Sequence, residues 1–401
     1  MTTLTASVRR WLTATECNLD EFRKVVEQET SARDYPHADK VSQGTLFYGE
    51  KLAADISSPA SRRDLQGEIA DALLNGPGVV IFKHAFESAV LDRASACYGS
   101  LIQQQKAQNI QTGDHFGKPG SNDRLWGALE KLAMADPEAF VDYFSNDVIA
   151  LVSAAWLGPD YQIISEPNVV NPGSEAQRPH RDYHLGNMDI GMAEEFPAHV
   201  HRFSPMLTLQ AAVAHCDMPA QAGPTMFLPH SQKYEHGYLA ANLPEFQDYF
   251  AAHYAQVPLD KGDTVFFNPA LLHGAGANRT ADVYRMANLL QISSAFGRSS
   301  ATVDTESVVT AIYASLRSRR ATGASERYLR NVITASSEGY PFPTNLDRDR
   351  PLGSLAPQSQ AQLVWRALEQ DWDDEQLRQE LAAQAERRRS TFAIPDAERP
   401  K

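Results

Sequence analysis

Cysteine is scarce in this sequence of 401 residues, which has three: Cys17, Cys97 and Cys216. An odd number scattered along the chain builds no disulfide framework and favours free thiols in a reducing compartment. Positive charge is also in deficit, because 37 lysines and arginines face 50 aspartates and glutamates, a net charge of −13. Such a chain opposes attraction to nucleic acid and to anionic membranes, so we expect neither as a partner.

Long apolar runs are missing as well. Residues 1–11 contain no apolar core of signal-peptide length, and no later run approaches the ~18 residues of a membrane span. We therefore expect a cytoplasmic protein. The chain is longer than the roughly 100 to 200 residues of a typical domain, so we expect one main domain with additions.

A histidine and an aspartate two positions apart form the most informative motif. On a strand, residues i and i+2 point to the same face, so His180 and Asp182 can hold one metal ion while Arg181 points away. Pro179 favours extended geometry here over a helix interior. His273 follows 91 residues after Asp182 (273 − 182). Two histidines and one carboxylate are typical of a facial triad, which holds one face of Fe(II) and leaves the other positions open.

A basic residue follows on what reads as the next strand. Arg285 can bind a carboxylate there through two parallel charge-assisted hydrogen bonds, as a dicarboxylate co-substrate such as 2-oxoglutarate would require.

At these residues the sequence resembles the phytanoyl-CoA dioxygenase family of Fe(II)/2-oxoglutarate-dependent oxygenases. The matching segments occur in the family's order, within residues 66–296: His180–His184, Ala222–Lys233, Lys261–Asp263, His273–Gly274 and Tyr284–Ala287. The resemblance implies that the catalytic iron is bound by His180, Asp182 and His273. It also implies that Arg285 holds the distal carboxylate of 2-oxoglutarate and that O2 is the second co-substrate.

Two departures from the family pattern leave roles open. The loop between His273 and Arg285 is slightly longer than usual, so Arg279 competes for the carboxylate role. Ala275 stands where many members carry a hydroxyl residue, so another side chain would have to supply one hydrogen bond to the co-substrate. The candidates for it are Thr208, Gln210 and Asn288.

Ordinary structural roles compete with these assignments. An isolated His-x-Asp pair is most often a surface or hydrogen-bonded pair, and Arg285 alone fits a surface arginine; the ordered pattern as a whole favours the metal site. His184 would be a ligand only if its segment were helical, and we expect it to support the site or contact substrate. His199 and His201 suggest a solvated loop. Structural roles are expected for the remaining histidines His215, His230, His236 and His253.

The periodicities predict a mainly β chain with flanking helices. Its core would be a double-stranded β-helix (jelly roll, cupin-like) over residues 61–299, after a mixed and helical segment, 1–60. Helices are expected near Asp20–Glu29, through Leu65, Ile69 and Leu73, at Ala89–Gln105 and at Val148–Trp156. Strands are expected at Val79–Phe82, Tyr161–Ser165, Met206–His215, Thr225–Leu228, Thr264–Phe267 and Val283–Ser293.

Residues 300–401 lie beyond the family pattern. Val364, Leu368 and Trp372 recur at helical spacing, and Leu377 and Leu381 continue it, so a helical C-terminal extension is expected to pack on the core or on another subunit. Packing on a second copy would make a homo-oligomer. Two loops are candidates to border the site, Leu185–Pro205 as a lid and Gly113–Trp126 as a mouth.

The predicted function is that of a hydroxylase, a dioxygenase that hydroxylates or desaturates an unactivated C–H bond of a small molecule. 2-Oxoglutarate and O2 would become succinate and carbon dioxide. A carboxylate ligand, Asp182, occupies the position that related halogenases leave open for chloride, which favours these outcomes over chlorination. One alternative is a metal-dependent isomerase or other non-redox cupin-like enzyme. The other is a noncatalytic small-molecule binding or sensor protein.

Overall fold

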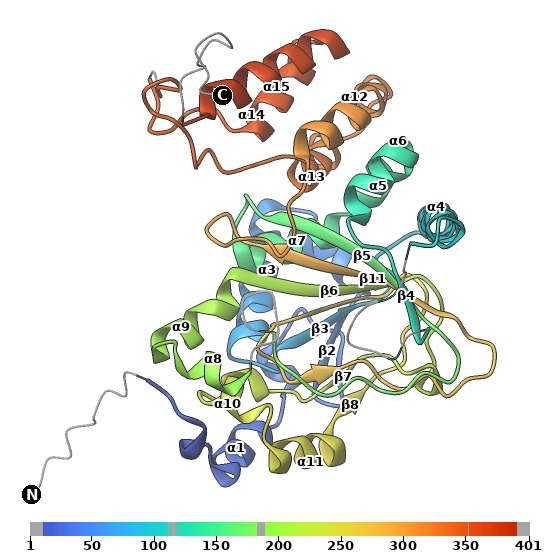
Figure 1. The fold of residues 1–401 in the computed structure, drawn as a ribbon, viewed down its shortest axis with the longest axis vertical. Coiled ribbons are helices and arrows are strands. Elements are labelled where there is room, and N and C mark those ends of the chain that lie inside the picture. Colours follow the sequence, from blue (N-terminus) through green and yellow to red (C-terminus); the bar gives the residue numbers. More distant parts are fainter. Residues whose placement is uncertain are drawn as a thin grey trace, which may run out of the picture.

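Two β-sheets lie at the centre of the computed structural model, which describes residues 11–110, 113, 118, 120–182, 189–351 and 353–390 (Figure 1). In this part of the chain the large sheet has the order β1-β2-β3-β9-β6-β11-β5-β4 and the small sheet the order β10-β7-β8. The strands are β1 (Lys40–Ser42), β2 (Thr45–Tyr48), β3 (Val79–Phe82), β4 (Asn122–Arg124), β5 (Gln162–Val170), β6 (Thr208–Ala214), β7 (Met226–Phe227), β8 (Ala255–Gln256), β9 (Thr264–Phe267), β10 (His273–Gly274) and β11 (Arg285–Ser293).

Helices cover the outer face of the large sheet and the lower end of the molecule (Figure 1). The α-helices are α1 (Leu19–Val26), α2 (Leu52–Asp55), α3 (Pro59–Leu74), α4 (Ser88–Ala107), α5 (Ala128–Ala135), α6 (Pro137–Phe144), α7 (Asp147–Leu157), α8 (Ile190–Glu194), α9 (Ala198–Phe203), α10 (Gly237–Ala240), α11 (Pro244–His253), α12 (Thr305–Ala321), α13 (Glu326–Ser336), α14 (Gln360–Glu369) and α15 (Asp374–Arg388). Short 3-10 helices are Ala14–Glu16, Ala32–Asp34, Ser204–Leu207, Ala220–Ala222 and Ser231–Lys233.

Helix α3 shows how local sequence sets these elements. The Ser58 side chain caps its N-terminus by accepting from the Ser61 backbone N–H, and Pro59 occupies the first turn, where a missing N–H costs nothing. The helix ends before Gly76, and its buried apolar side chains face the sheet. This confirms the predicted helix and the predicted strand that follows it, β3.

The predicted mainly β chain is confirmed only in a coarser form, a large mixed sheet with flanking helices. Helices occupy more of the described chain than strands do. The prediction missed α5 and α6, because α6 carries buried apolar residues on most of its circumference and shows no clear helical period. Among the described residues, no helix has the length and apolar character needed to cross a membrane.

The C-terminal helices pack on the protein's own helical layer. Helix α12 contacts α5 and α6, α13 contacts α6, α7 and β5, and α15 contacts α12 and α14. Leu377 and Leu381 of α15 belong to the same core cluster as the helix-facing side chains of the large sheet. Trp372, predicted as part of one helical spacing, lies between α14 and α15. The division of the chain at residues 60 and 300 stays a prediction.

The His-x-Asp segment lies beside β10 and not in a longer strand. His180 and His273 form an isolated antiparallel bridge, with hydrogen bonds from His180 N to His273 O (2.8 Å) and from His273 N to His180 O (3.0 Å). The Gln177 N–H donates to Ala275 O at 2.8 Å, and the Asp182 N–H donates to Pro269 O at 2.9 Å. The predicted extended geometry is therefore present, and it aligns the two segments that contain the predicted metal ligands side by side.

Arg181 anchors this segment from the side opposite the metal motif. Its buried guanidinium donates to the backbone oxygens of Ser231 and Tyr234, and its carbon lies 5.4 Å from the Tyr238 ring centroid. Burial lowers the pKa of Arg181 to about 10, so the group stays charged at neutral pH. Gly237 packs directly against it, because a Cβ at this position would overlap the guanidinium.

We expect Gly237→Ala to lower the free energy of unfolding by about 1 to 3 kcal/mol, since the added methyl group must displace the Arg181 guanidinium from its carbonyls. Urea denaturation measures the change. Gly67→Ala, on the exposed side of α3, is the control: a Cβ there meets nothing within 4 Å. It should stabilise the protein by about 0.5 to 1 kcal/mol. Similar stabilities for the two variants would contradict the proposed anchoring.

Candidate active site

Three side chains from the two paired segments converge on one point. His180 Nε2 lies 3.8 Å from Asp182 Oδ1, and His273 Nε2 lies 3.8 Å from Asp182 Oδ2. The two imidazole centroids are 4.5 Å apart, and one potential ligand atom from each residue lies within 4.8 Å of the others. This is the spacing of side chains that share one metal ion. The residues predicted as the triad are thus brought together.

Backbone contacts fix which ring nitrogen of each histidine is available. His180 Nδ1 lies 3.0 Å from the Arg178 carbonyl oxygen, and His273 Nδ1 lies 2.7 Å from the Leu271 carbonyl oxygen. Because a carbonyl only accepts, each Nδ1 carries the proton and each Nε2 keeps a lone pair directed at Asp182. Burial, helped by the neighbouring His180, lowers the pKa of His273 to about 4. The ring is therefore neutral at neutral pH, the form that binds metals.

Asp182 is oriented by two further contacts. Gln210, on β6, donates from Nε2 to Asp182 Oδ2, and the Tyr238 hydroxyl donates to the Asp182 backbone oxygen at 3.1 Å. Gln210 was expected to contact a co-substrate. The structure places it in the same cavity but in contact with the carboxylate of the triad.

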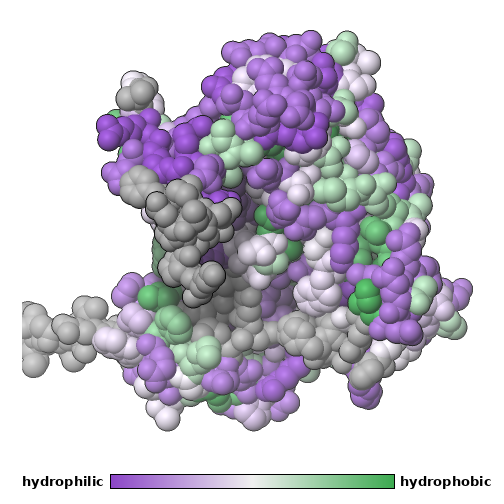
Figure 2. Space-filling view, turned by 45° about the horizontal axis from the view of Figure 1, so that its top comes forward, coloured by the Kyte–Doolittle hydropathy of each residue, from purple (hydrophilic) through white to green (hydrophobic). Residues whose placement is uncertain are grey.

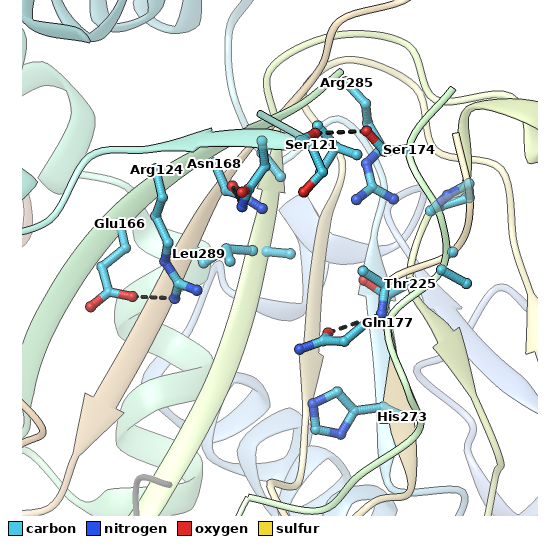
Figure 3. Close-up of a pocket in the computed structure, with 18 of the residues that line it drawn as sticks. Ser121, Arg124, Glu166, Asn168, Ser174, Gln177, Thr225, His273, Arg285 and Leu289 are labelled. Atoms are coloured by element: carbon cyan, nitrogen blue, oxygen red, sulfur yellow. Dashed lines mark hydrogen bonds and ion pairs between the residues drawn. The ribbon is translucent and has the colours of Figure 1, made fainter. Parts of the chain in front are cut away.

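The triad opens into a cavity of ≈930 Å³, and one face of the molecule is deeply hollowed (Figure 2). In Figure 3, His273 and Gln177 lie on one side of this cavity, with Arg285 above them and Arg124 and Glu166 on the opposite side. A cavity of this volume has room for a small organic ligand together with a co-substrate.

Arg285 begins β11 and reaches into the cavity. It is 6% exposed, and among the described residues no side chain or carbonyl accepts a hydrogen bond from its guanidinium. Burial lowers the pKa of Arg285 to about 10, which leaves it cationic at neutral pH. A buried cation without a protein counter-ion is costly, so an anionic ligand is its natural partner.

The competing arginine is placed elsewhere. Arg279 is exposed and borders a separate cavity of ≈250 Å³. Its backbone N–H donates to Gln221 O at 2.7 Å. Of the two arginines, only Arg285 borders the cavity that contains the triad.

Two other expected co-substrate contacts do not reach the cavity. Thr208 is buried at the beginning of β6 and is not among the residues that line the cavity. Asn288 faces the helical layer, where it accepts from Ser165 Oγ (2.9 Å) and donates to the Tyr143 hydroxyl (3.0 Å). The reason is strand alternation, because Asn288 and Arg285 are three positions apart on β11 and point to opposite faces. Neither residue is supported as a co-substrate contact.

We expected His199 and His201 to lie in a solvated loop, and this prediction is wrong for His201. His199 is exposed, whereas His201 is buried in α9 with its ring centroid 5.9 Å from that of Tyr238. The predicted lid region therefore contains two short helices, α8 and α9. His184, residues 185–188 of the predicted lid, and residues 114–117 and 119 of the predicted mouth loop lie outside the described residues.

Structural roles are confirmed for several histidines. His215 is buried on the helical side of the large sheet, with Nδ1 2.8 Å from Ser95 Oγ and Nε2 3.0 Å from the Tyr143 hydroxyl. His230 Nε2 lies 3.0 Å from Thr30 Oγ1.

Sequence reasoning missed Glu166, which faces the cavity from β5 and pairs with Arg124 of β4. Arg124 entered only as part of a mouth loop. An acidic residue directly after the predicted strand Tyr161–Ser165 is the one signal that could have indicated the pair, because such a charge is rarely buried without a partner.

Among curated proteins, none matches the chain in sequence. Similar solved structures include AviO1 from Streptomyces viridochromogenes Tue57, with 17% identity, coverage of 59% of this chain and 98% of that chain, and a TM-score of 0.42. The alpha-ketoglutarate-dependent carbocyclase SnoK from nogalamycin biosynthesis has 17% identity, coverage of 60% and 86%, and a TM-score of 0.43. HygX from Streptomyces hygroscopicus, with nickel and 2-oxoglutarate bound, has 14% identity, coverage of 57% and 87%, and a TM-score of 0.38.

The model of the phytanoyl-CoA dioxygenase family matches residues 74–287, a stretch that includes His180, Asp182, His273 and Arg285. Because this match spans more than half of the chain, the protein belongs to the phytanoyl-CoA dioxygenase family and is an Fe(II)/2-oxoglutarate-dependent enzyme that uses O2.

Proposed function

We propose that the enzyme hydroxylates or desaturates an unactivated C–H bond of a small molecule. In this proposal His180, Asp182 and His273 bind the iron, and Arg285 binds the distal carboxylate of 2-oxoglutarate. The observation that carries the proposal is the buried Arg285, which has no counter-ion among the described residues and borders the same cavity as the three converging ligand atoms.

The strand orders support a double-stranded β-helix around this site. Four strands of the large sheet, in the order β5-β11-β6-β9, would form one wall. The His180 segment, β10, β7 and β8 would form the other, since the His180–His273 bridge extends the small sheet by one position. Two walls of this kind enclose a shaped cavity from which bulk water is excluded.

The protein's own groups have separate tasks. The Nδ1–H bonds of His180 and His273 keep both Nε2 atoms available, and Gln210 holds the Asp182 carboxylate in place. Iron with 2-oxoglutarate and O2 supplies the oxidising chemistry when bound, and the cavity orients the carbon that reacts. An Asp182 ligand leaves no place for chloride, which favours hydroxylation or desaturation over chlorination.

The competing functions differ in what they require. A non-redox isomerase with the same three ligands has no need for a buried anion-binding arginine, so Arg285 argues against it. A noncatalytic binding protein would keep the cavity without turnover. For the partners, the acidic chain and the ≈930 Å³ cavity support a small-molecule substrate and no nucleic acid. Association through the C-terminal helices stays a prediction.

Anaerobic visible absorption tests the site. We expect a charge-transfer band when Fe(II) and 2-oxoglutarate are added to the wild type, and its loss in His273→Ala. Arg285→Ala should require at least about tenfold more 2-oxoglutarate for half of the band, because a charge-assisted hydrogen-bond pair is lost. Arg279→Ala, a matched control, should behave as the wild type.

Two outcomes of this titration would contradict the assignment. No band in the wild type at any 2-oxoglutarate concentration would favour the non-redox enzyme or the binding protein. A band weakened by Arg279→Ala and unchanged by Arg285→Ala would transfer the carboxylate role to Arg279.

Gln210→Leu tests the support of the carboxylate. We expect its Mn(II) affinity, measured by titration in the absence of 2-oxoglutarate, to fall about ten- to a hundredfold, since groups that orient metal ligands typically contribute this much. Gln291→Leu is the control. Gln291 of β11 pairs with Gln210 of β6 and lines the same cavity, but its side chain accepts from Ser300 Oγ and has no hydrogen bond with Asp182 among the described residues. An equal loss of affinity in both variants would exclude a specific role for Gln210.

A further inference from the structure

The wall of the cavity opposite His273 carries an ion pair that the proposed chemistry does not use. Glu166 of β5 and Arg124 of β4 form this pair, which Figure 3 shows across the cavity from His273. Both residues are buried, Glu166 at 3% and Arg124 at 8% exposed, and both line the cavity. The cost of desolvating a charged pair at this depth is best repaid when its remaining hydrogen-bonding capacity is also used.

Glu166 has capacity left. Arg124 donates to its Oε2 atom, but among the described residues no group donates to Oε1. A carboxylate oxygen without a protein donor has to be satisfied by a group in the space that it faces. Since Glu166 lines the cavity, a ligand in the cavity can supply the missing donor.

The charge balance indicates which kind of donor fits. Arg124 neutralises Glu166, so the pair has no net charge to offer a second cation. A neutral hydroxyl group satisfies Oε1 without adding a charge to this buried wall, whereas an ammonium group would leave an unbalanced positive charge.

The next inward-facing residue on β5 adds a hydrogen-bond donor to the acceptor of Glu166. Asn168 lies two positions after Glu166, on the same face of the strand, and accepts from Asn122 Nδ2 at 2.8 Å. Its own Nδ2 has no acceptor among the described residues. This wall therefore presents an acceptor and a donor side by side, which matches hydroxyl groups because each one both donates and accepts.

An aromatic ring borders the same wall. The Arg124 guanidinium carbon lies 4.4 Å from the Trp126 ring centroid, and Trp126 also lines the cavity. A flat apolar face beside polar groups suits the carbon face of a hydroxylated ring.

The register of the sheet gives the distance from the triad. Gln210, which contacts Asp182, pairs with Gln291, and Gln291 pairs with Ile164 of β5. Two strand spacings of ~4.8 Å separate β6 from β5, so Glu166 lies on the order of 10 Å from Gln210. A substrate of one or two rings spans that distance.

We propose that Arg124, Glu166 and Asn168 form a subsite for the hydroxyl groups of a neutral, hydroxyl-bearing substrate. The subsite holds that substrate while another of its carbons faces the triad. This assignment rests on the proposed function, because it places the substrate in the cavity that the triad and Arg285 define.

The variant Arg124→Met/Glu166→Leu tests the subsite. Replacing both members of a buried ion pair with apolar residues of similar size usually preserves the fold, whereas removing one member leaves a buried charge. The control is Arg330→Met/Glu326→Leu, which removes an exposed ion pair on α13 and changes the charge in the same way. Thermal unfolding checks that both variants fold.

The probes are myo-inositol, cyclohexanol and cyclohexylammonium, and saturation-transfer NMR with the Mn(II)-free protein detects their binding. We expect wild type and control to bind myo-inositol more tightly than cyclohexanol. The cavity variant should bind myo-inositol at least about tenfold more weakly, since hydrogen bonds to a charged group are lost. Asn168→Ala, which leaves the ion pair intact, should weaken it in the same direction.

Three results would overturn the subsite. They are preferential binding of cyclohexylammonium, equal binding of myo-inositol by wild type and cavity variant, and no binding of myo-inositol by the wild type at millimolar concentration. The Fe(II)/2-oxoglutarate band is measured on the same proteins. Loss of probe binding with an intact band concerns the subsite alone, whereas a wild type that binds myo-inositol but shows no band would overturn only the proposed iron chemistry.

Discussion

The antiparallel bridge between His180 and His273 is the contact on which the site depends. These residues are far apart in the sequence, and their two reciprocal backbone hydrogen bonds bring both imidazoles to the same side as Asp182. The same geometry directs each Nδ1–H to a carbonyl two positions earlier in its own segment. The backbone pairing thus sets the tautomers as well as the positions, so the ligand geometry needs few further side-chain contacts.

Three buried arginines lie around this bridge, and each has a different kind of partner. Arg181, behind the triad, has its donors used by backbone carbonyls and serves the fold. Arg124 forms an ion pair with Oε2 of Glu166, and Oε1 of Glu166 faces the cavity as a further hydrogen-bond acceptor. Arg285 has neither kind of partner among the described residues, and so its desolvation is compensated only when an anion binds. The three arginines therefore differ in the partners that the protein itself provides for their guanidinium groups.

The sequence predicted that His180, Asp182 and His273 lie together, because the motif His-x-Asp and the distal histidine are local patterns, but it did not predict the short strand β10 that contains His273. It left Arg285 and Arg279 unresolved, since the choice depends on where β11 begins after the loop. Asn288 was misjudged for the same reason: once Arg285 is the first inward residue, period-two alternation turns Asn288 to the helices. The pair of Glu166 with Arg124 depends on the register of β4 against β5, a long-range pairing that no local pattern encodes.

Strand β11 shows how one element serves both layers. Its inward positions carry Arg285, Leu289 and Gln291 into the cavity, while Asn288 joins Ser165 and Tyr143 in a buried polar network beneath the helices. One face of β11 lines the cavity and the other packs on the helices. Shifting β11 by one residue would therefore place Asn288 in the cavity and remove Arg285 from it. The polar network on the outer face therefore helps to fix the register that places Arg285 in the cavity.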